Sequence, residues 1–145
     1  MVKTVAFPTG SKPYMLRVSR DGTEVWVQTG VANTNVVLAA DDLAELATEA
    51  TGKGPVTNAW TPDGRYSIIT NTGDTYASVF DAKTYREVKR LEIGEGGSNI
   101  GFSSDGTTAF ITVARANAVA VVDMTRLEVV EQVPVGTQPT GLIVR

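Results

Sequence analysis

Ser103-Ser104-Asp105-Gly106-Thr107-Thr108-Ala109-Phe110-Ile111-Thr112 is one of three copies of a single pattern in this chain. The earlier copies are Ser19-Arg20-Asp21-Gly22-Thr23-Glu24-Val25-Trp26-Val27-Gln28 and Thr61-Pro62-Asp63-Gly64-Arg65-Tyr66-Ser67-Ile68-Ile69-Thr70. Their Asp-Gly pairs follow one another at a constant step of 42 residues. A fixed period of this size is typical of repeat architectures.

The same register extends well beyond the Asp-Gly pairs. Glycines and bulky apolar residues recur at the 42-residue step. The glycines are Gly10, Gly52, Gly94 and Gly136, and the apolar sets are Val18, Trp60, Phe102 and Val144, then Val27, Ile69 and Ile111. This many coincidences in one register establish a true repeat.

Each repeat predicts four short strands separated by turns. In the second copy we expect strands near Val56–Trp60, Tyr66–Thr70, Ala77–Phe80 and Glu87–Ile93, because Gly, Pro, Asn and Asp cluster between them. Four antiparallel strands in 42 residues make the unit of a β-propeller blade. The fold class is therefore all-β, with about 3.5 blades in the chain.

The stretch Asp41–Gly52 is ambiguous. Its acidic start, its leucines and its terminal glycine favour a capped helix when they are considered alone. In register, however, it aligns with the fourth strands of the later copies. We favour a strand there, because tertiary pairing overrides weak propensity.

The Asp-Gly turns have a structural interpretation. An aspartate before glycine caps its own backbone amides and leaves the positive φ to the glycine. We therefore assign a turn-forming role to three pairs: Asp21 with Gly22, Asp63 with Gly64, and Asp105 with Gly106. In-register aromatic residues are assigned to packing between blades: Trp26, Trp60, Phe80, Phe102 and Phe110.

Composition limits the function. The 145 residues carry a net charge of −3 without a basic run, which argues against nucleic acid as a partner. Apolar runs are too short for a membrane span. Histidine and cysteine are both absent, so no conventional nucleophile–base pair can form. We expect no cofactor and no metal site, and the chain is not expected to be an enzyme.

The third copy carries motifs that resemble the YVTN-type β-propeller repeat of surface-layer-like and cytochrome d1-like proteins. The motifs are Phe110-Ile111-Thr112-Val113, Asn117-Ala118-Val119-Ala120-Val121-Val122-Asp123 and Val133-Pro134-Val135-Gly136. The first copy departs from this pattern at Ala39 and across 41–50. The resemblance covers nearly the whole chain and implies an extracytoplasmic location, although no signal peptide precedes the repeats.

The ends of the repeats predict how a ring could be completed. Residues 1–9 are expected to form the outer strand of an incomplete blade, 10–51, 52–93 and 94–135 three full repeats, and 136–145 the first strand of a further repeat. Propellers have about 4–8 blades. The chain is therefore either part of a longer or engineered propeller, or it completes its ring as a homodimer or other homo-oligomer. A homodimer is attractive because twice 145 residues is close to the length of seven repeats. A junction between two such chains would lack the two middle strands of a blade.

One face of the ring is the predicted binding surface. It collects the turns between the second and third strands and those between repeats, and loops on one face of a repeated scaffold commonly carry binding residues. Lys12, Asn71, Asp74 and Arg115 are our candidates for contact with a protein or small-molecule ligand. The function predicted is a non-enzymatic binding scaffold. The alternative is part of a haem d1 or lactonase-like propeller enzyme whose catalytic residues are absent here.

Overall fold

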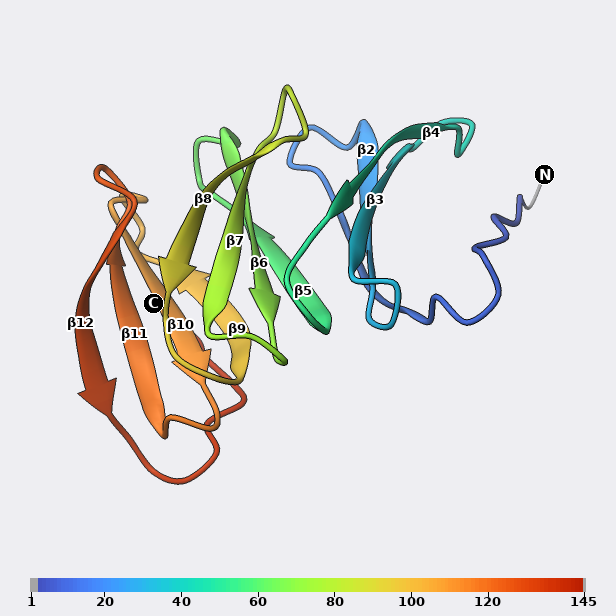
Figure 1. Ribbon diagram of the computed structural model, residues 1–145. Helices are drawn as coiled ribbons and strands as arrows, with labels where there is room; N and C mark the ends of the chain where they lie inside the picture. The colour runs from blue at the N-terminus through green and yellow to red at the C-terminus, as the bar shows by residue number, and fades with distance from the viewer. Residues whose placement is uncertain (1–2, 145) are drawn as a thin grey trace.

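The computed structural model describes residues 3–144, and within them the chain is all-β (Figure 1). Twelve strands form three antiparallel sheets of four, with no helix among the described residues, and so none that could cross a membrane. The strands are β1 (Pro13–Val18), β2 (Glu24–Thr29), β3 (Thr34–Ala39), β4 (Glu45–Ala50), β5 (Pro55–Trp60), β6 (Tyr66–Asn71), β7 (Tyr76–Asp81), β8 (Glu87–Glu92), β9 (Gly97–Phe102), β10 (Thr108–Val113), β11 (Ala118–Asp123) and β12 (Glu128–Pro134).

Each sheet is one blade, and the three blades stand in a row. Blade 1 contains β1–β4, blade 2 β5–β8 and blade 3 β9–β12, with the strands of each blade paired in chain order. Figure 1 shows blade 1 at the right, blade 2 in the middle and blade 3 at the left. The predicted all-β, four-stranded blade is therefore what the chain forms.

The Asp-Gly pairs make equivalent turns between the first and second strands. In each, the carboxylate accepts a hydroxyl hydrogen bond of 2.6 Å, from Ser19, Thr61 or Ser103. These hydroxyl bonds are the main reason that the pKa of each aspartate lies below its usual value. The glycines that follow have φ of 78°, 72° and 73°, which L-residues rarely adopt.

The ambiguous stretch after Asp41 forms a strand. β4 pairs with β3 from Thr34↔Ala50 to Leu38↔Glu45, so its backbone groups are satisfied by the blade. A helix there would leave the outer edge of β3 unpaired. The local helix propensity is overridden by this pairing.

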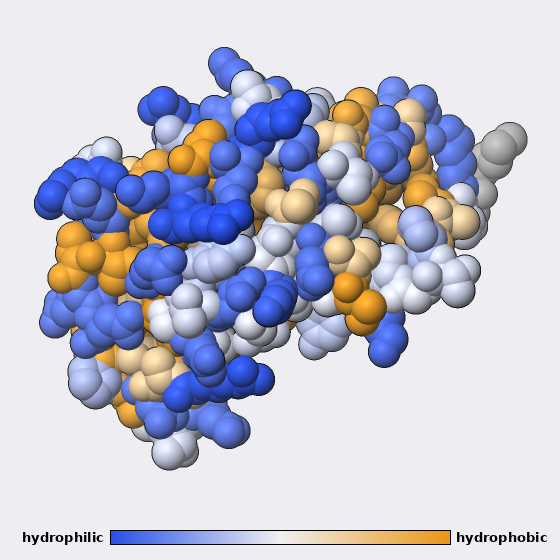
Figure 2. Space-filling view, viewed as in Figure 1, coloured by the Kyte–Doolittle hydropathy of each residue, from blue (hydrophilic) through white to orange (hydrophobic). Residues whose placement is uncertain are grey.

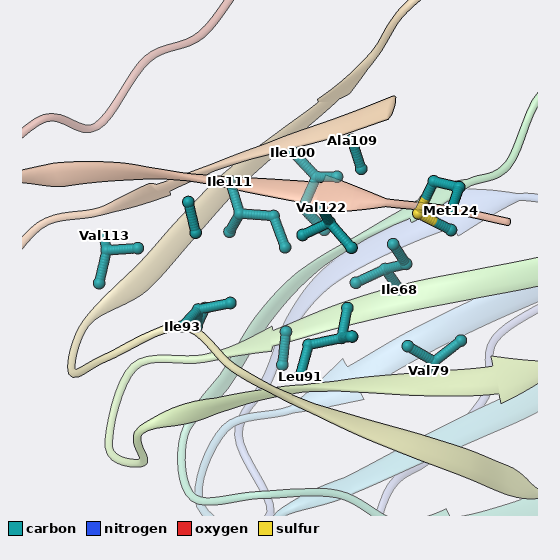
Figure 3. Packing of buried hydrophobic residues seen from close by; sticks show 12 residues of the cluster. Ile68, Val79, Leu91, Ile93, Ile100, Ala109, Ile111, Val113, Val122 and Met124 are labelled. Carbon is teal, nitrogen blue, oxygen red and sulfur yellow. The ribbon is translucent and has the colours of Figure 1, made fainter. Parts of the chain in front are cut away.

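Blades 2 and 3 meet through an apolar core. Ile68, Val79 and Leu91 of blade 2 pack against Ile111 and other residues of blade 3, as Figure 3 shows from close by. The blade 3 side contributes Ile100, Ala109, Ile111, Val113, Ala120, Val122 and Met124. These two blades are held together mainly by the hydrophobic effect.

Blades 1 and 2 meet through an aromatic cluster. Trp26 is fully buried and lies edge-to-face with Trp60, Phe80 and Tyr85, with ring centroids 4.7, 6.3 and 6.0 Å away. Its indole N–H donates to Glu24 at 2.8 Å, and the Tyr85 hydroxyl donates to the other oxygen of Glu24 at 2.6 Å. Of the five aromatic residues assigned to packing, Trp26 and Phe80 are fully buried, whereas Trp60, Phe102 and Phe110 are partly exposed.

The link between Tyr85 and Glu24 predicts a pH dependence. The hydrogen bond to the Glu24 carboxylate, together with burial, raises the pKa of Tyr85 to about 12 from 10.0. Because the folded state binds this proton more tightly, its stabilising contribution is complete below pH 10 and is lost as the pH rises toward 12. We expect the unfolding midpoint in urea to fall over this range, and to fall less in Tyr85→Phe. Equal slopes in both proteins would contradict the assignment.

The predictions for the two ends need correction. Residues 3–9 and 136–144 form no strand, because the remaining strands of their blades are not there to pair with them; residues 1, 2 and 145 lie outside the described part. Val5 and Phe7 nevertheless pack on the free face of blade 1, against Val27, Val36 and Leu38. Phe7 occupies the repeat position of Leu91, which packs in the same way on blade 3. The segment thus covers the expected face without joining a sheet.

Candidate binding pocket and open blade faces

A pocket of about 600 Å³ lies where the first strands of the three blades converge. Its lining includes residues of the β2–β3, β6–β7 and β10–β11 turns. These turns lie toward the bottom of Figure 1. This is the face predicted for binding. The lining residues are Tyr14, Gly30, Gly54, Pro55, Val56, Thr72, Gly96, Ser98, Ala114, Arg115, Gln138 and Thr140.

The pocket is built from positions that are equivalent by the repeat. Tyr14, Val56, Ser98 and Thr140 are 42 residues apart, and so are Gly30, Thr72 and Ala114. The first set supplies variable side chains, whereas the second supplies the turn between the second and third strands. The repeated scaffold therefore presents one variable position from each repeat around the pocket.

A third repeated set shapes the rim by its backbone. Lys12, Gly54, Gly96 and Gln138 all have positive φ, of 50°, 60°, 88° and 51°. At Gly96 the left-handed backbone brings the chain against the next turn, where an added Cβ would lie 2.8 Å from the amide nitrogen of Arg115. The backbone conformation at this repeat position is therefore the same in all four copies, although the residue type differs.

Of the four predicted binding residues, only Arg115 lines the pocket. Its guanidinium is exposed and lies 3.7 Å from the Glu95 carboxylate. A long ion pair between exposed groups contributes little, so the guanidinium is available to a ligand. Lys12 is exposed on the same face, and its carbonyl accepts from the Gly30 amide at 2.9 Å.

Asn71 and Asp74 hold the blade together and do not face the pocket. The Asn71 side chain is fully buried, and its amide nitrogen donates to the Tyr76 carbonyl and the Ser78 hydroxyl at 3.1 Å each. A carboxylate oxygen of Asp74 accepts from the Lys53 amide at 2.6 Å, which ties this turn to the start of blade 2. The placement of Asn71 corrects the sequence prediction of an exposed binding residue.

Three side-chain hydroxyls were missed by sequence reasoning. Tyr14, Ser98 and Thr140 line the pocket, and no hydrogen bond ties their hydroxyls to the described residues. The repeat pattern could have identified them, since they share one repeat position on the first strand. The pocket thus combines one cation with several hydroxyls, and no carboxylate is among the described residues that line it.

The two outward faces of the row of blades are apolar and incompletely covered. Figure 2 shows apolar surface at both ends of the row. On blade 1, Leu16 is 55% exposed, whereas Ile100 at the same repeat position of blade 3 is 8% exposed. On blade 3, Val133 is 37% exposed, whereas its counterpart Leu91 in blade 2 is 2% exposed. Both ends therefore present residues that the internal junctions bury.

Solved structures with similar folds are β-propeller proteins. Hydrazine synthase of Kuenenia stuttgartiensis aligns with 96% of this chain and 41% of its own, at 24% identity and a TM-score of 0.83. The periplasmic gluconolactonase PpgL of Pseudomonas aeruginosa aligns over 94% of this chain and 43% of its own, at 23% identity and a TM-score of 0.81. The WD40 repeats of RRP9 align over 88% and 41%, at 12% identity and a TM-score of 0.78.

No protein-family model and no curated protein matches the chain. The structural likeness establishes the class: this chain forms β-propeller blades. It spans less than half the length of the propeller chains that it resembles. At these identities the likeness shows the fold alone, and the relation to YVTN-type repeats in particular stays a prediction.

Proposed function

We propose that this chain is a non-enzymatic propeller scaffold that binds a small polar ligand in the axial pocket and completes its ring with further copies of itself. The observation that carries the proposal is the lining of the pocket by repeat-equivalent positions from all three blades. Ligand pockets of 300–1,000 Å³ with a few convergent polar groups are the usual size and type of a small-molecule site.

The lining fits a polyhydroxy carboxylate best. Arg115 can pair with a carboxylate, because a guanidinium presents two parallel donors that match its geometry. Ser98, Thr140 and Tyr14 can exchange hydrogen bonds with hydroxyl groups. The likeness to a periplasmic gluconolactonase is compatible with this class of ligand and with an extracytoplasmic location.

The rival proposal is a lactonase-like part of a larger propeller enzyme, and the chemistry of the pocket supports it less well. Lactone hydrolysis by general-base catalysis needs a group that removes a proton from water at neutral pH. The described lining residues offer no carboxylate, and the chain has no histidine. Binding without turnover is therefore the better-supported function.

Calorimetric titration with sodium gluconate, alongside a hydrolysis assay with glucono-1,5-lactone, tests the proposal. We expect saturable gluconate binding, weakened on the order of 10-fold or more in Arg115→Ala, because a hydrogen bond to a charged group contributes about 1.5–3 kcal/mol. Arg126→Ala is the matched control, since Arg126 is equally exposed in the turn that follows Asp123, outside the pocket.

Two results would contradict the proposal. An absence of gluconate binding would remove the assigned ligand class. Lactone hydrolysis that scales with protein concentration and disappears in Arg115→Ala would establish the enzymatic alternative.

A further inference from the structure

The faces through which blades meet fall into two chemical classes. We call the face of a blade that points toward the preceding blade its leading face and the opposite one its trailing face. On the leading face of blade 2, every second residue of β6 and β7 points toward Trp26 and its neighbours, and Ser67 and Ser78 are fully buried there beside Ile69 and Phe80. This leading face is half polar.

The trailing face of blade 1 matches it in polarity. Gln28 and Asn35 are fully buried, and the Gln28 amide donates to the Asn35 carbonyl oxygen at 3.0 Å. On the other side of the junction, within blade 2, the buried Asn58 donates to Ser67 at 3.0 Å. These hydrogen bonds lie within single blades, and a buried amide is desolvated at a lower cost beside polar side chains than beside apolar ones. A polar face therefore selects a polar partner.

The junction between blades 2 and 3 belongs to the second class. At the positions of Gln28 and Asn35, blade 2 has Thr70 and Ala77. At the positions of Ser67 and Ser78, blade 3 has Ala109 and Ala120. Apart from Thr70, whose hydroxyl donates to the Ser98 carbonyl, the side chains at these positions are apolar.

The two open faces of the chain are both of the apolar class. The leading face of blade 1 is apolar at all six positions compared, like that of blade 3 and unlike that of blade 2. Its residues are Leu16, Val18, Val25, Val27, Val36 and Leu38, at the positions of Ile100, Phe102, Ala109, Ile111, Ala120 and Val122. The trailing face of blade 3 carries Phe110, Thr112, Val119, Val121 and Val133, at the positions of Ile68, Thr70, Ala77, Val79 and Leu91.

We propose that the trailing face of blade 3 binds the leading face of blade 1 of a second copy, head to tail, in the manner in which blade 2 meets blade 3. This inference rests on the ring completion in the proposed function and names the surfaces that achieve it. The polar junction between blades 1 and 2 determines which faces can pair, because the polar leading face of blade 2 is a poor partner for an apolar trailing face. In the single chain, the two end segments occupy part of this contact: Val5 and Phe7 lie on the blade 1 face, and Leu142 and Val144 lie against Gly101 of blade 3. Neither segment joins a sheet, and Leu16 and Val18 remain more than half exposed. The second copy therefore displaces these end segments when it binds.

A head-to-tail contact uses two different surfaces, and this gives it a distinctive test. Leu16→Glu places a charge on the leading face only, and Val133→Glu places one on the trailing face only. Both side chains are exposed in the single chain, so each variant should fold, which circular dichroism checks. Val88→Glu is the matched control, because Val88 is 49% exposed on the outer strand of blade 2 and lies on neither open face.

Light scattering on a sizing column at several protein concentrations is the measurement. We expect the unaltered protein and Val88→Glu to form oligomers, and Leu16→Glu and Val133→Glu each to run as the 15.4 kDa monomer. Mixing the two monomeric variants leaves one intact trailing face and one intact leading face. The mixture should therefore form a pair of about twice that mass and no larger species.

Each other outcome overturns the inference. A monomeric unaltered protein excludes self-association. Oligomers that persist in both variants place the contact elsewhere, and variants that are both monomeric but fail to pair indicate a symmetric contact between like faces. Gluconate titration of the same samples tests the ligand-binding part of the proposed function separately from ring completion, because the pocket is formed within one chain.

Discussion

Replacing Trp26 with alanine should lower the free energy of unfolding by about 3–5 kcal/mol, the usual cost of removing a large aromatic side chain from a core. Trp26 is fully buried at the junction of blades 1 and 2 and lies edge-to-face with three aromatic rings. Such ring pairs contribute about 0.5–1.5 kcal/mol each beyond the area that they bury. The substitution also deprives Glu24 of one of its two side-chain donors.

Chemical denaturation of three variants measures this effect. Trp26→Ala should shift the midpoint most, and Trp60→Ala less, because Trp60 is only partly buried. Tyr14→Ala is the aromatic control, since Tyr14 is 68% exposed and surface substitutions usually change stability by less than about 0.5 kcal/mol. A midpoint for Trp26→Ala equal to that of Tyr14→Ala would show that blade 1 does not dock on blade 2 as described.

The sequence predicted the blade well because every local signal agreed with the repeat. Turn residues, strand alternation and the 42-residue step all place β5 to β8 within a residue or two of their observed bounds. Even the ambiguous stretch after Asp41 was decided correctly by register, since the neighbouring strand β3 pairs with it. Consistency between local and global preference is what makes such a chain predictable.

The errors arose where an outcome depended on which face of a blade is covered. Phe110 was assigned to packing, but it lies on the open trailing face of blade 3 and remains partly exposed. Asn71 was assigned to the binding surface because it begins a turn, but as the last residue of β6 it lies in line with Ile69 on a buried face. Residues 3–9 and 136–144 match strands in sequence, yet a strand needs a paired neighbour.

Departures from the repeat proved more informative than agreements with it. In the first copy Gln28 stands where the later copies have threonine, and Asn35 where they have alanine or valine. In the second copy Ser67 and Ser78 stand where the other copies have valine or alanine. The structure places all four at the same junction, which the sequence could not show without knowing which faces meet. The polar residues of one blade therefore identify the partner blade that carries matching ones.

Placing an asparagine, the counterpart of Asn35 in blade 1, in the apolar junction between blades 2 and 3 should be strongly destabilising. Ala77→Asn puts the Asn35 side chain at the equivalent position of blade 2, where Ala77 is fully buried among Leu91, Ile111 and Val113. We expect a loss of about 1–3 kcal/mol for an unpaired buried amide and about 1–3 kcal/mol more for overpacking. No glutamine is available to hydrogen-bond with the new asparagine, because blade 2 has Thr70 at the repeat position of Gln28 in blade 1.

Ala50→Asn is the matched control for this change, because Ala50 lies at an exposed position of the outer strand β4. Its unfolding midpoint should stay within about 0.5 kcal/mol of that of the unaltered protein. The double variant Ala77→Asn with Thr70→Gln rebuilds the Gln–Asn pair of blade 1 and should recover part of the loss, since it supplies the missing hydrogen bond. If Ala77→Asn alone is as mild as Ala50→Asn, the two junctions do not differ in class, and the basis for matching the open faces to each other is lost.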